Sequence, residues 1–292
     1  MFVTRSHGYW RSKDLLNWEF VRPGKNWYSQ GCNAPAAHNY KDSVLYVAGD
    51  PSGSMSILYT DDPASGDWEA TPAILHNLQD PDLFIDDDGK AYIFYGTGQL
   101  RELKPDLSDV MPGGVDMKIF ERDKEENALL EGSRVIKHDG KYYLLMISWP
   151  RGGKRRQVCY RADKITGPYE KKVILEDAFA GFPYVAQGTI VDDGKGNWYG
   201  VIFQDRGGVG RVLTLNPCHW INDWPMLGDS NGKVPSTVKV IVDHAGSGKA
   251  QSLVDNENFD ETQHPYDLFL HNWEWNHNPI DTDWSLKERK GW

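Results

Sequence analysis

The feature that most constrains the fold of this chain is a sequence repeat of about fifty residues. Three segments share an aromatic strand end, a polar turn and an aromatic residue followed by Glu, and these aromatic residues are Trp18, Trp68 and Tyr169. The first two lie about 50 residues apart and the last two about 100, so one unit between them lacks the pattern. Repeats of this length are typical of solenoids and propellers, in which each unit is one supersecondary element.

A second pattern falls between these segments. Turn residues followed by an aromatic strand recur at residues 43–46, 89–92, 140–143 and 196–199. Another short strand is expected ahead of each hairpin, over residues 34–40, 80–85, 131–137 and 187–191. Each unit therefore holds roughly three or four short antiparallel strands, which is typical of a propeller blade. A β-sandwich with accidental similarity between its hairpins is the alternative.

The repeat also predicts where the inner strand of each blade begins. These strands are expected to start at Asn33, Asp80, Glu131 and Gln187. One further step of about fifty residues back from Asn33 falls before Met1, so the first blade is expected to lack its inner strand. The sequence thus predicts an all-β fold, a five-bladed β-propeller whose first blade is incomplete.

Two carboxylates are expected to face one axial pocket. The inner strands of a propeller begin around its axis, and Asp80 and Glu131 hold equivalent positions in adjacent blades of the repeat. Glycoside hydrolysis requires a pair of Asp or Glu side chains, one a protonated acid and the other ionised. Their proximity raises the pKa of the acid. The alternative is that Asp80 caps a turn with Pro81 while Glu131 faces solvent.

The same segments resemble glycoside hydrolase family 43. Residues 80–90 (DPDLFIDDDGK) are similar to the family motif around the aspartate that tunes the acid, and residues 131–134 (EGSR) are similar to the general-acid motif. Arg211, preceded by Gly210, resembles the arginine that contacts the substrate. The resemblance covers about residues 9–228 and implies a five-bladed propeller.

The resemblance implies an inverting hydrolase that acts on terminal pentosides of plant cell-wall polysaccharides, either β-xylosides or α-L-arabinofuranosides. Under this interpretation Glu131 protonates the leaving oxygen and Asp80 holds the pKa of Glu131 up and binds a sugar hydroxyl. Arg211 anchors the substrate. Further substrate-binding residues are expected to be Gln187, Asn33 and Trp149.

The chain also departs from the family pattern. The general base of the family is an Asp at the start of the first blade, a stretch that is not in this chain, and the nearest sequence alternatives are Asp50 and Asp205. A catalytically impaired or dead propeller that only binds carbohydrate is therefore the alternative function. In addition, Asn33 stands where many members carry a Trp before Ala-Pro.

The predicted chemistry requires no cofactor, and no metal ligands are predicted from residue spacing. Gln187 occupies the place where many family members carry a His near the axis and a bound cation, so a structural Ca²⁺ there is the one ion that the resemblance implies. The acidic runs 86–88 and 192–193 precede Gly and are interpreted as hairpin turns instead of calcium loops. The three cysteines show no metal-type spacing.

After a propeller domain at residues 1–235, residues 236–292 are predicted to form a linker and the truncated start of a C-terminal β-sandwich. This segment must pack on the propeller or expose an apolar surface, and the latter would offer a route to an oligomer. Its aromatic residues include Trp273, Trp275, Trp284 and Trp292.

The composition limits the partners. A formal net charge of −10 argues against nucleic acid, and no apolar run is long enough for a membrane span, so the expected partner is an oligosaccharide or polysaccharide substrate. The chain begins without a signal-peptide core, whereas the resemblance weakly favours a secreted or periplasmic location. The basic run Lys154-Arg155-Arg156 is interpreted as a solvated hairpin tip.

Overall fold

The computed structural model describes residues 8–12, 18–21, 23–24, 33–49, 55–74, 78–183 and 185–239, together with Ser285 and Glu288. The predicted sandwich fragment at 236–292 falls almost wholly outside these residues, as does Asp50, one of the alternatives for the general base, so what was predicted for them stays a prediction. The chain divides into two compact units, of which one is Leu78–Val240 and the other combines Met1–Asn77 with Ile241–Trp292.

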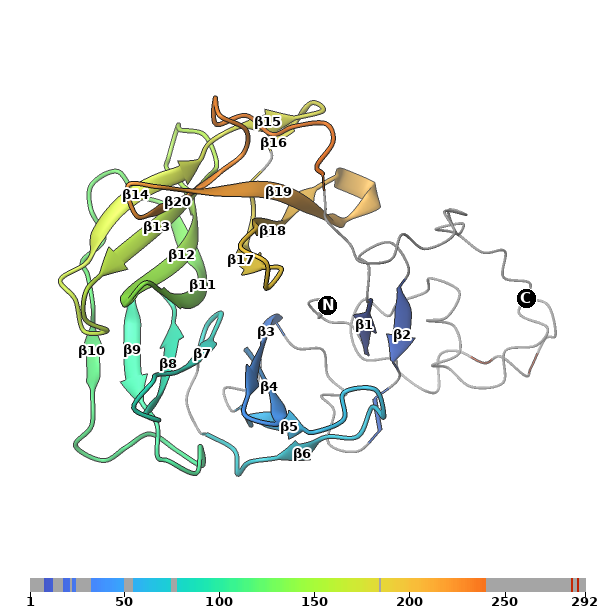
Figure 1. Cartoon of the computed structure of the whole chain (residues 1–292), viewed down its shortest axis with the longest axis vertical. Helices are drawn as coiled ribbons and strands as arrows, with labels where there is room; N and C mark the ends of the chain where they lie inside the picture. The colour runs from blue at the N-terminus through green and yellow to red at the C-terminus, as the bar shows by residue number, and fades with distance from the viewer. Residues whose placement is uncertain are drawn as a thin grey trace. The chain divides into compact units, whose positions relative to one another are not determined.

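The unit Leu78–Val240 contains three four-stranded antiparallel sheets, each made of strands that follow one another in the chain (Figure 1). The first sheet comprises β7 (Asp82–Ile85), β8 (Ala91–Tyr95), β9 (Gln99–Glu102) and β10 (Asp116–Lys118). The second comprises β11 (Leu129–His138), β12 (Lys141–Trp149), β13 (Arg156–Ala162) and β14 (Glu170–Leu175). The third comprises β17 (Gly188–Asp192), β18 (Trp198–Asp205), β19 (Arg211–Ile221) and β20 (Trp224–Leu227).

Three shorter elements complete this unit. The strands β15 (Ala178–Phe179) and β16 (Phe182–Pro183) form a small hairpin before β17. A single 3₁₀ turn, η1 (Gly207–Val209), separates β18 from β19. In the described part of the chain, no helix is long and apolar enough to cross a membrane.

The described residues of the other unit hold the remaining strands. A two-stranded hairpin is formed by β1 (Tyr9–Arg11) and β2 (Glu19–Val21). A four-stranded antiparallel sheet is formed by β3 (Asn33–Tyr40), β4 (Ser43–Gly49), β5 (Leu58–Thr60) and β6 (Glu69–Ala70).

These sheets confirm the prediction of an all-β propeller. The described residues hold four four-stranded meanders, with the β1–β2 hairpin where the repeat predicts the first of five blades. Within the unit Leu78–Val240, β11 contacts both β7 and β17, so the first strands of its three blades lie together (Figure 1). The beginnings of these three strands therefore meet in one region, as expected around a propeller axis.

Both faces of the central blade are buried. Leu144 and Met146 of β12 lie in the apolar cluster that contains Phe94 of β8. Tyr143, which alternates with them along the strand, lies in the cluster that contains Ile202 of β18. Burying a side chain of this size stabilises a fold by roughly 1.5–3 kcal/mol. The blade is thus held on both sides, and the start of β11 is fixed between β7 and β17.

The acidic runs are turns, as the sequence predicts. In the β7–β8 turn the backbone N–H of Gly89, at φ 84°, donates to the carbonyl of Asp86, and the N–H of Lys90 donates to Oδ1 of Asp88 at 3.0 Å. The run at 192–193 accepts N–H groups of its own turn in the same way. These carboxylates satisfy backbone donors, which is the usual use of Asp in hairpin turns.

A β-bulge interrupts β11 at the residue that the sequence singled out. Glu131 pairs with Ile147, but the next pair joins Arg134 to Leu145, so β11 contains one extra residue. Gly132 lies inside the bulge at φ 80°, a conformation that costs glycine little. The bulge turns the strand locally and directs the residues at its start away from the regular alternation.

The blade of β7 follows the same path, and this corrects the predicted equivalence by one residue. Asp82 is the first paired residue of β7, and three residues earlier the carbonyl of Gln79 accepts the N–H of Gly96 at 2.7 Å. Gln79 is therefore the structural counterpart of Glu131. Asp80, at φ 48°, takes the bulge position instead of the strand-start position that the repeat predicted.

Candidate active site

Glu131 lies half-buried at the start of β11, and its surroundings favour the protonated form. Burial raises the pKa of this carboxyl, and the nearby Asp80 carboxylate raises it further. The guanidinium groups of Arg211 and Arg155 and a hydrogen bond from Gln79 oppose the rise in pKa without cancelling it. A carboxyl that keeps its proton toward neutral pH is what a general acid needs.

Asp80 is the second carboxyl of the site. Burial raises its pKa as well, against the opposing charge of Arg134, a hydrogen bond from the backbone N–H of Gly132 and the charge of Arg211. A positive φ is uncommon for a non-glycine residue, although Asp tolerates it better than most. Such backbone strain clusters at functional sites.

Both carboxyl groups lie in surroundings that favour a proton. Burial raises the pKa of each, and the charge of Asp80 raises the pKa of Glu131 further. The structure thus brings together Asp80 and Glu131, the two residues that the sequence predicted to face one pocket. This arrangement can supply a neutral carboxyl group beside an ionised one, which suits the acid of glycoside cleavage but does not by itself supply the base.

Two glutamines flank Glu131 at the same level of the neighbouring blades. Nε2 of Gln79 donates a hydrogen bond to Oε2 of Glu131 at 2.9 Å. Gln187 lies on the other side, where a Cβ added to Gly132 would come within 2.8 Å of its Cγ. The carbonyl of Gln187 accepts the N–H of Phe203 in β18. Gln187 therefore holds the same place in its blade as Glu131, which pairs with Ile147 of β12. Gln187 thus lies beside the residue that follows Glu131, and its predicted contact with substrate stays a prediction.

Two arginines and one aspartate form a charged clamp beside the carboxyl pair. Nη1 of Arg155 donates a hydrogen bond to Oδ2 of Asp205, and Nε of Arg211 lies 3.5 Å from Oδ1 of the same residue. Each guanidinium also lies over an aromatic ring, Arg155 over Trp149 at 5.5 Å and Arg211 over Phe203 at 4.7 Å. The clamp holds both cations at the edge of the site.

The interpretation of residues 154–156 as a solvated hairpin tip is wrong for two of the three. The side chains of Arg155 and Arg156 are only 11% and 12% exposed. Arg155 is turned toward Asp205 of the next blade, and Arg156 pairs with Glu126. Clustered basic residues normally remain in solvent, but here carboxylates from other strands compensate their charge.

The other two residues that were predicted to bind substrate, Trp149 and Asn33, lie in different parts of the structure. Trp149 ends β12 and is 45% exposed as a residue, and Arg155 of the clamp lies over its ring. Asn33 begins β3 in the other compact unit, so its contribution to the site stays a prediction. Sequence reasoning missed Gln79 and Arg155. For Gln79 the only available signal was its position directly before Asp80.

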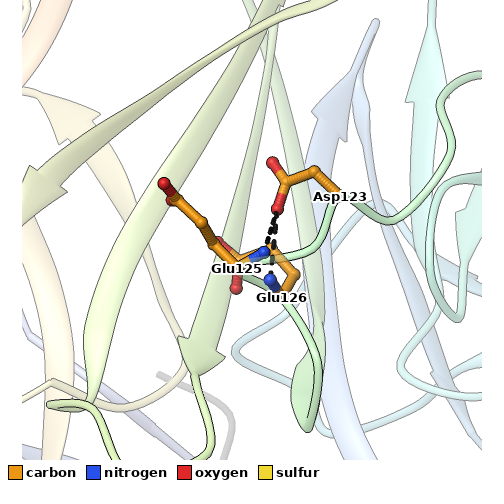
Figure 2. Close-up of side chains that lie close together, drawn as sticks. All are labelled: Asp123, Glu125 and Glu126. Atoms are coloured by element: carbon orange, nitrogen blue, oxygen red, sulfur yellow. Dashed lines mark hydrogen bonds between the residues drawn. The ribbon is translucent and has the colours of Figure 1, made fainter.

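One acidic group in the described residues has the spacing of a metal site. Asp123, Glu125 and Glu126 precede β11 and offer carboxylate oxygens within 4.8 Å of one another (Figure 2). However, Nη2 of Arg156 lies 2.7 Å and Nζ of Lys171 3.0 Å from Oε1 of Glu126. Two cations thus already compensate the buried charge, and we interpret the group as a structural ion-pair network.

The calcium ion implied near the axis stays a prediction. Ca²⁺ takes 6–8 oxygen ligands, most of them carboxylates or carbonyls. Gln187 offers one amide oxygen, and in the described residues the only cluster of three acidic ligands is the group that precedes β11. No step of the proposed chemistry depends on the ion.

Comparison with known proteins places these features in one family. The family model for glycosyl hydrolases family 43 matches residues 4–225. A putative beta-xylosidase of Xylanibacter ruminicola is 31% identical over 96% of this chain and 55% of its own length. A non-reducing end alpha-L-arabinofuranosidase of Bacteroides ovatus is 27% identical over 97% of this chain and 57% of its own.

A solved structure has a similar fold. A bifunctional GH43-CE protein of Bacteroides eggerthii superimposes with a TM-score of 0.75 at 34% identity, over 96% of this chain and 38% of that one. The chain therefore spans about half the length of the curated relatives it matches, and less of this structure. The five-bladed propeller expected from the sequence is confirmed by the match.

Proposed function

Because the chain belongs to glycosyl hydrolase family 43, we propose that it hydrolyses terminal β-xylosides or α-L-arabinofuranosides of plant cell-wall polysaccharides with inversion. The observation that carries the proposal is the coupling of Glu131 to Asp80, which raises the pKa of Glu131 in addition to the effect of burial. Relatives named as xylosidases and arabinosidases support the substrate class.

In the proposed mechanism Glu131 gives its proton to the glycosidic oxygen as the bond to the anomeric carbon breaks. Asp80 keeps the pKa of Glu131 high and accepts a hydrogen bond from a sugar hydroxyl. Arg211, held by Asp205, anchors the substrate, and Gln187 and Trp149 contribute further contacts. Water attacks the opposite face of the sugar, assisted by a base whose carboxyl lies ~6.5–9.5 Å from the acid.

Carbohydrate binding without hydrolysis is the second candidate function. The observation that favours it concerns Asp205, the candidate base that the structure describes. Both of its carboxylate oxygens face guanidinium groups, one from Arg155 and one from Arg211. A carboxylate held by two guanidinium groups suits an anchoring role better than that of a base that activates water.

Hydrolysis of an aryl β-xyloside and an aryl α-L-arabinofuranoside tests the proposal. The anomer formed first is identified by NMR, and binding of xylo-oligosaccharides is measured by calorimetry. The expected result is hydrolysis of at least one substrate with inversion, and its loss in Glu131→Gln but not in Glu121→Gln, a control at an exposed carboxyl. Binding without hydrolysis would favour the second function, and neither binding nor hydrolysis would contradict both.

A further inference from the structure

The neighbour that contacts Glu131 most directly is an amide instead of a charged group. Gln79 lies before β7, at the position equivalent to Glu131 in the adjacent blade, and its Nε2 donates to Oε2 of Glu131 at 2.9 Å. We propose that Gln79 is a positioning residue that holds Oε2 of Glu131 and leaves Oε1 as the proton-donating oxygen. This inference rests on the proposed function.

The chemistry of the amide and the carboxyl group supports Oε1 as the oxygen that donates the proton. The NH₂ group of a glutamine only donates, so the oxygen that receives it must offer a lone pair. A proton on Oε2 that pointed at the amide hydrogen would repel that hydrogen and weaken the bond. The proton of neutral Glu131 therefore belongs on Oε1. When the Oε1–H bond breaks, the proton passes to the glycosidic oxygen, which keeps the electron pair of its broken bond to the anomeric carbon. Water completes the reaction by adding at that carbon and passing a proton to the general base.

The hydrogen bond also serves the product of this step. Glu131 then carries a negative charge, and the bond from Gln79 to Oε2 becomes charge-assisted, which makes it stronger than a bond between neutral partners. The contact is thus kept in both protonation states and gains strength as the proton leaves. An interaction that strengthens toward the transition state accelerates the chemical step.

The backbone on both sides holds Gln79 in place. The carbonyl of Gln79 accepts the N–H of Gly96, which pairs this position with β8. The next residue, Asp80, accepts a hydrogen bond from the N–H of Gly132, the residue after Glu131. Two consecutive residues of one blade are therefore bonded to two consecutive residues of the next. The two contacts together orient the carboxyl of Glu131 more firmly than the bond from Gln79 alone could.

Two substitutions test the proposal. Gln79→Leu removes the donor at nearly constant size, and Gln79→Glu keeps the shape but replaces the donor with an acid. Asn231→Leu, at an exposed turn of the same unit, is the matched control. The pKa of Glu131 is measured by ¹³C NMR, with Glu131→Gln assigning its resonance, and kcat is measured on aryl pentosides with leaving groups of different acidity.

In Gln79→Leu the ionised form of Glu131 loses a donor, so its pKa is expected to rise by about one unit. Hydrolysis of poor leaving groups should fall at least about tenfold, while dinitrophenyl glycosides, which need little acid assistance, should change by less than about threefold. Gln79→Glu should raise the pKa of Glu131 as well, because it brings a like charge. A merely structural role would affect all leaving groups equally.

The outcomes separate this inference from the proposed function. If the wild-type protein hydrolyses pentosides but Gln79→Leu leaves the pKa of Glu131 and the leaving-group dependence at the values of Asn231→Leu, the role of Gln79 is overturned and the function stands. If the wild-type protein neither binds nor hydrolyses pentosides, while Gln79→Leu still shifts the pKa of Glu131, the proposed function is overturned and the coupling between the two residues stands.

Discussion

Arg155 donates a hydrogen bond to Asp205, and this contact links the turn after β12 to the end of β18 in the next blade. The same carboxylate also lies 3.5 Å from Nε of Arg211, so one aspartate holds two cations beside Glu131. Both cations lower the pKa of Glu131 and oppose the effects of burial and of Asp80. If Arg211 anchors the substrate as proposed, the clamp connects that anchoring with the protonation of Glu131.

Asp205→Asn should weaken substrate binding more than it slows the chemical step. The amide cannot hold both guanidinium groups, so Arg211 becomes mobile and KM should rise about threefold to tenfold, a modest effect because Asp205 is partly exposed. Steady-state kinetics on an aryl pentoside measures this change. Asp163→Asn, which removes an exposed partner of Lys141, is the control and should leave KM unchanged. An equal loss of kcat at constant KM would contradict the anchoring role.

Gly132→Ala should destabilise the protein by about 2–4 kcal/mol. The residue has a positive φ, and the new Cβ would lie 2.8 Å from Cγ of Gln187. Gly89→Ala also places alanine at a positive φ, 84°, but nothing lies within 4 Å of the new Cβ. Its free energy of unfolding should therefore fall by only about 1 kcal/mol. Chemical denaturation of both variants measures the difference. Equal losses would show that the contact with Gln187 is unimportant.

Glu126 should make the free energy of unfolding depend on pH in the acidic range. Burial alone would raise its pKa, but hydrogen bonds from Ser148, Lys171 and Arg156 outweigh burial and lower the pKa below its ordinary value. A carboxyl with a lowered folded-state pKa contributes stability above its unfolded pKa, and this stability is lost as the pH falls through the folded value. The free energy of unfolding should therefore decline below about pH 4.5.

Glu126→Gln tests this prediction. The substitution leaves Lys171 and Arg156 without their buried anion and should cost about 3–5 kcal/mol at pH 7, with a smaller difference from wild type at low pH. Glu125→Gln, at a side chain that is 69% exposed, contacts the same cations and should cost under about 1 kcal/mol. A cost for Glu126→Gln that does not shrink as the pH falls would contradict the electrostatic explanation.

The blades could be predicted from the sequence because the repeat is periodic. Strand alternation and the turn residues recur in every unit, and these local patterns place Glu131 and Gln187 within two residues of the first residues of β11 and β17. The match of Asp80 to Glu131 was wrong by one residue. The two blades share the same bulge, and the backbone pairing makes Gln79 the counterpart of Glu131, a register that residue type does not mark because Gln79 lacks the carboxyl group. Asp80 has its left-handed φ at this bulge, where Asp is tolerated but not required.

The clamp could not be predicted for a different reason. Lys154, Arg155 and Arg156 form a basic run beside two glycines, and such a run is usually solvated. The carboxylates that pair with Arg155 and Arg156 are distant in the sequence, Asp205 in β18 and Glu126 in the segment before β11. Only the packing of one blade on the next brings these groups together, and periodicity does not encode that contact.

The pKa of Glu131, measured by ¹³C NMR in the wild-type protein and in Asp80→Asn, tests the central claim most directly. Asn tolerates the positive φ at position 80, so the backbone should be kept while the charge is lost. The account predicts a pKa above the ordinary glutamate value in the wild type, because of burial and of the Asp80 carboxylate, and a fall of roughly one unit in Asp80→Asn. The alkaline limb of kcat/KM should move to lower pH by the same amount. An ordinary pKa in the wild type, or a raised pKa that Asp80→Asn does not lower, would contradict the pairing of these two carboxyl groups.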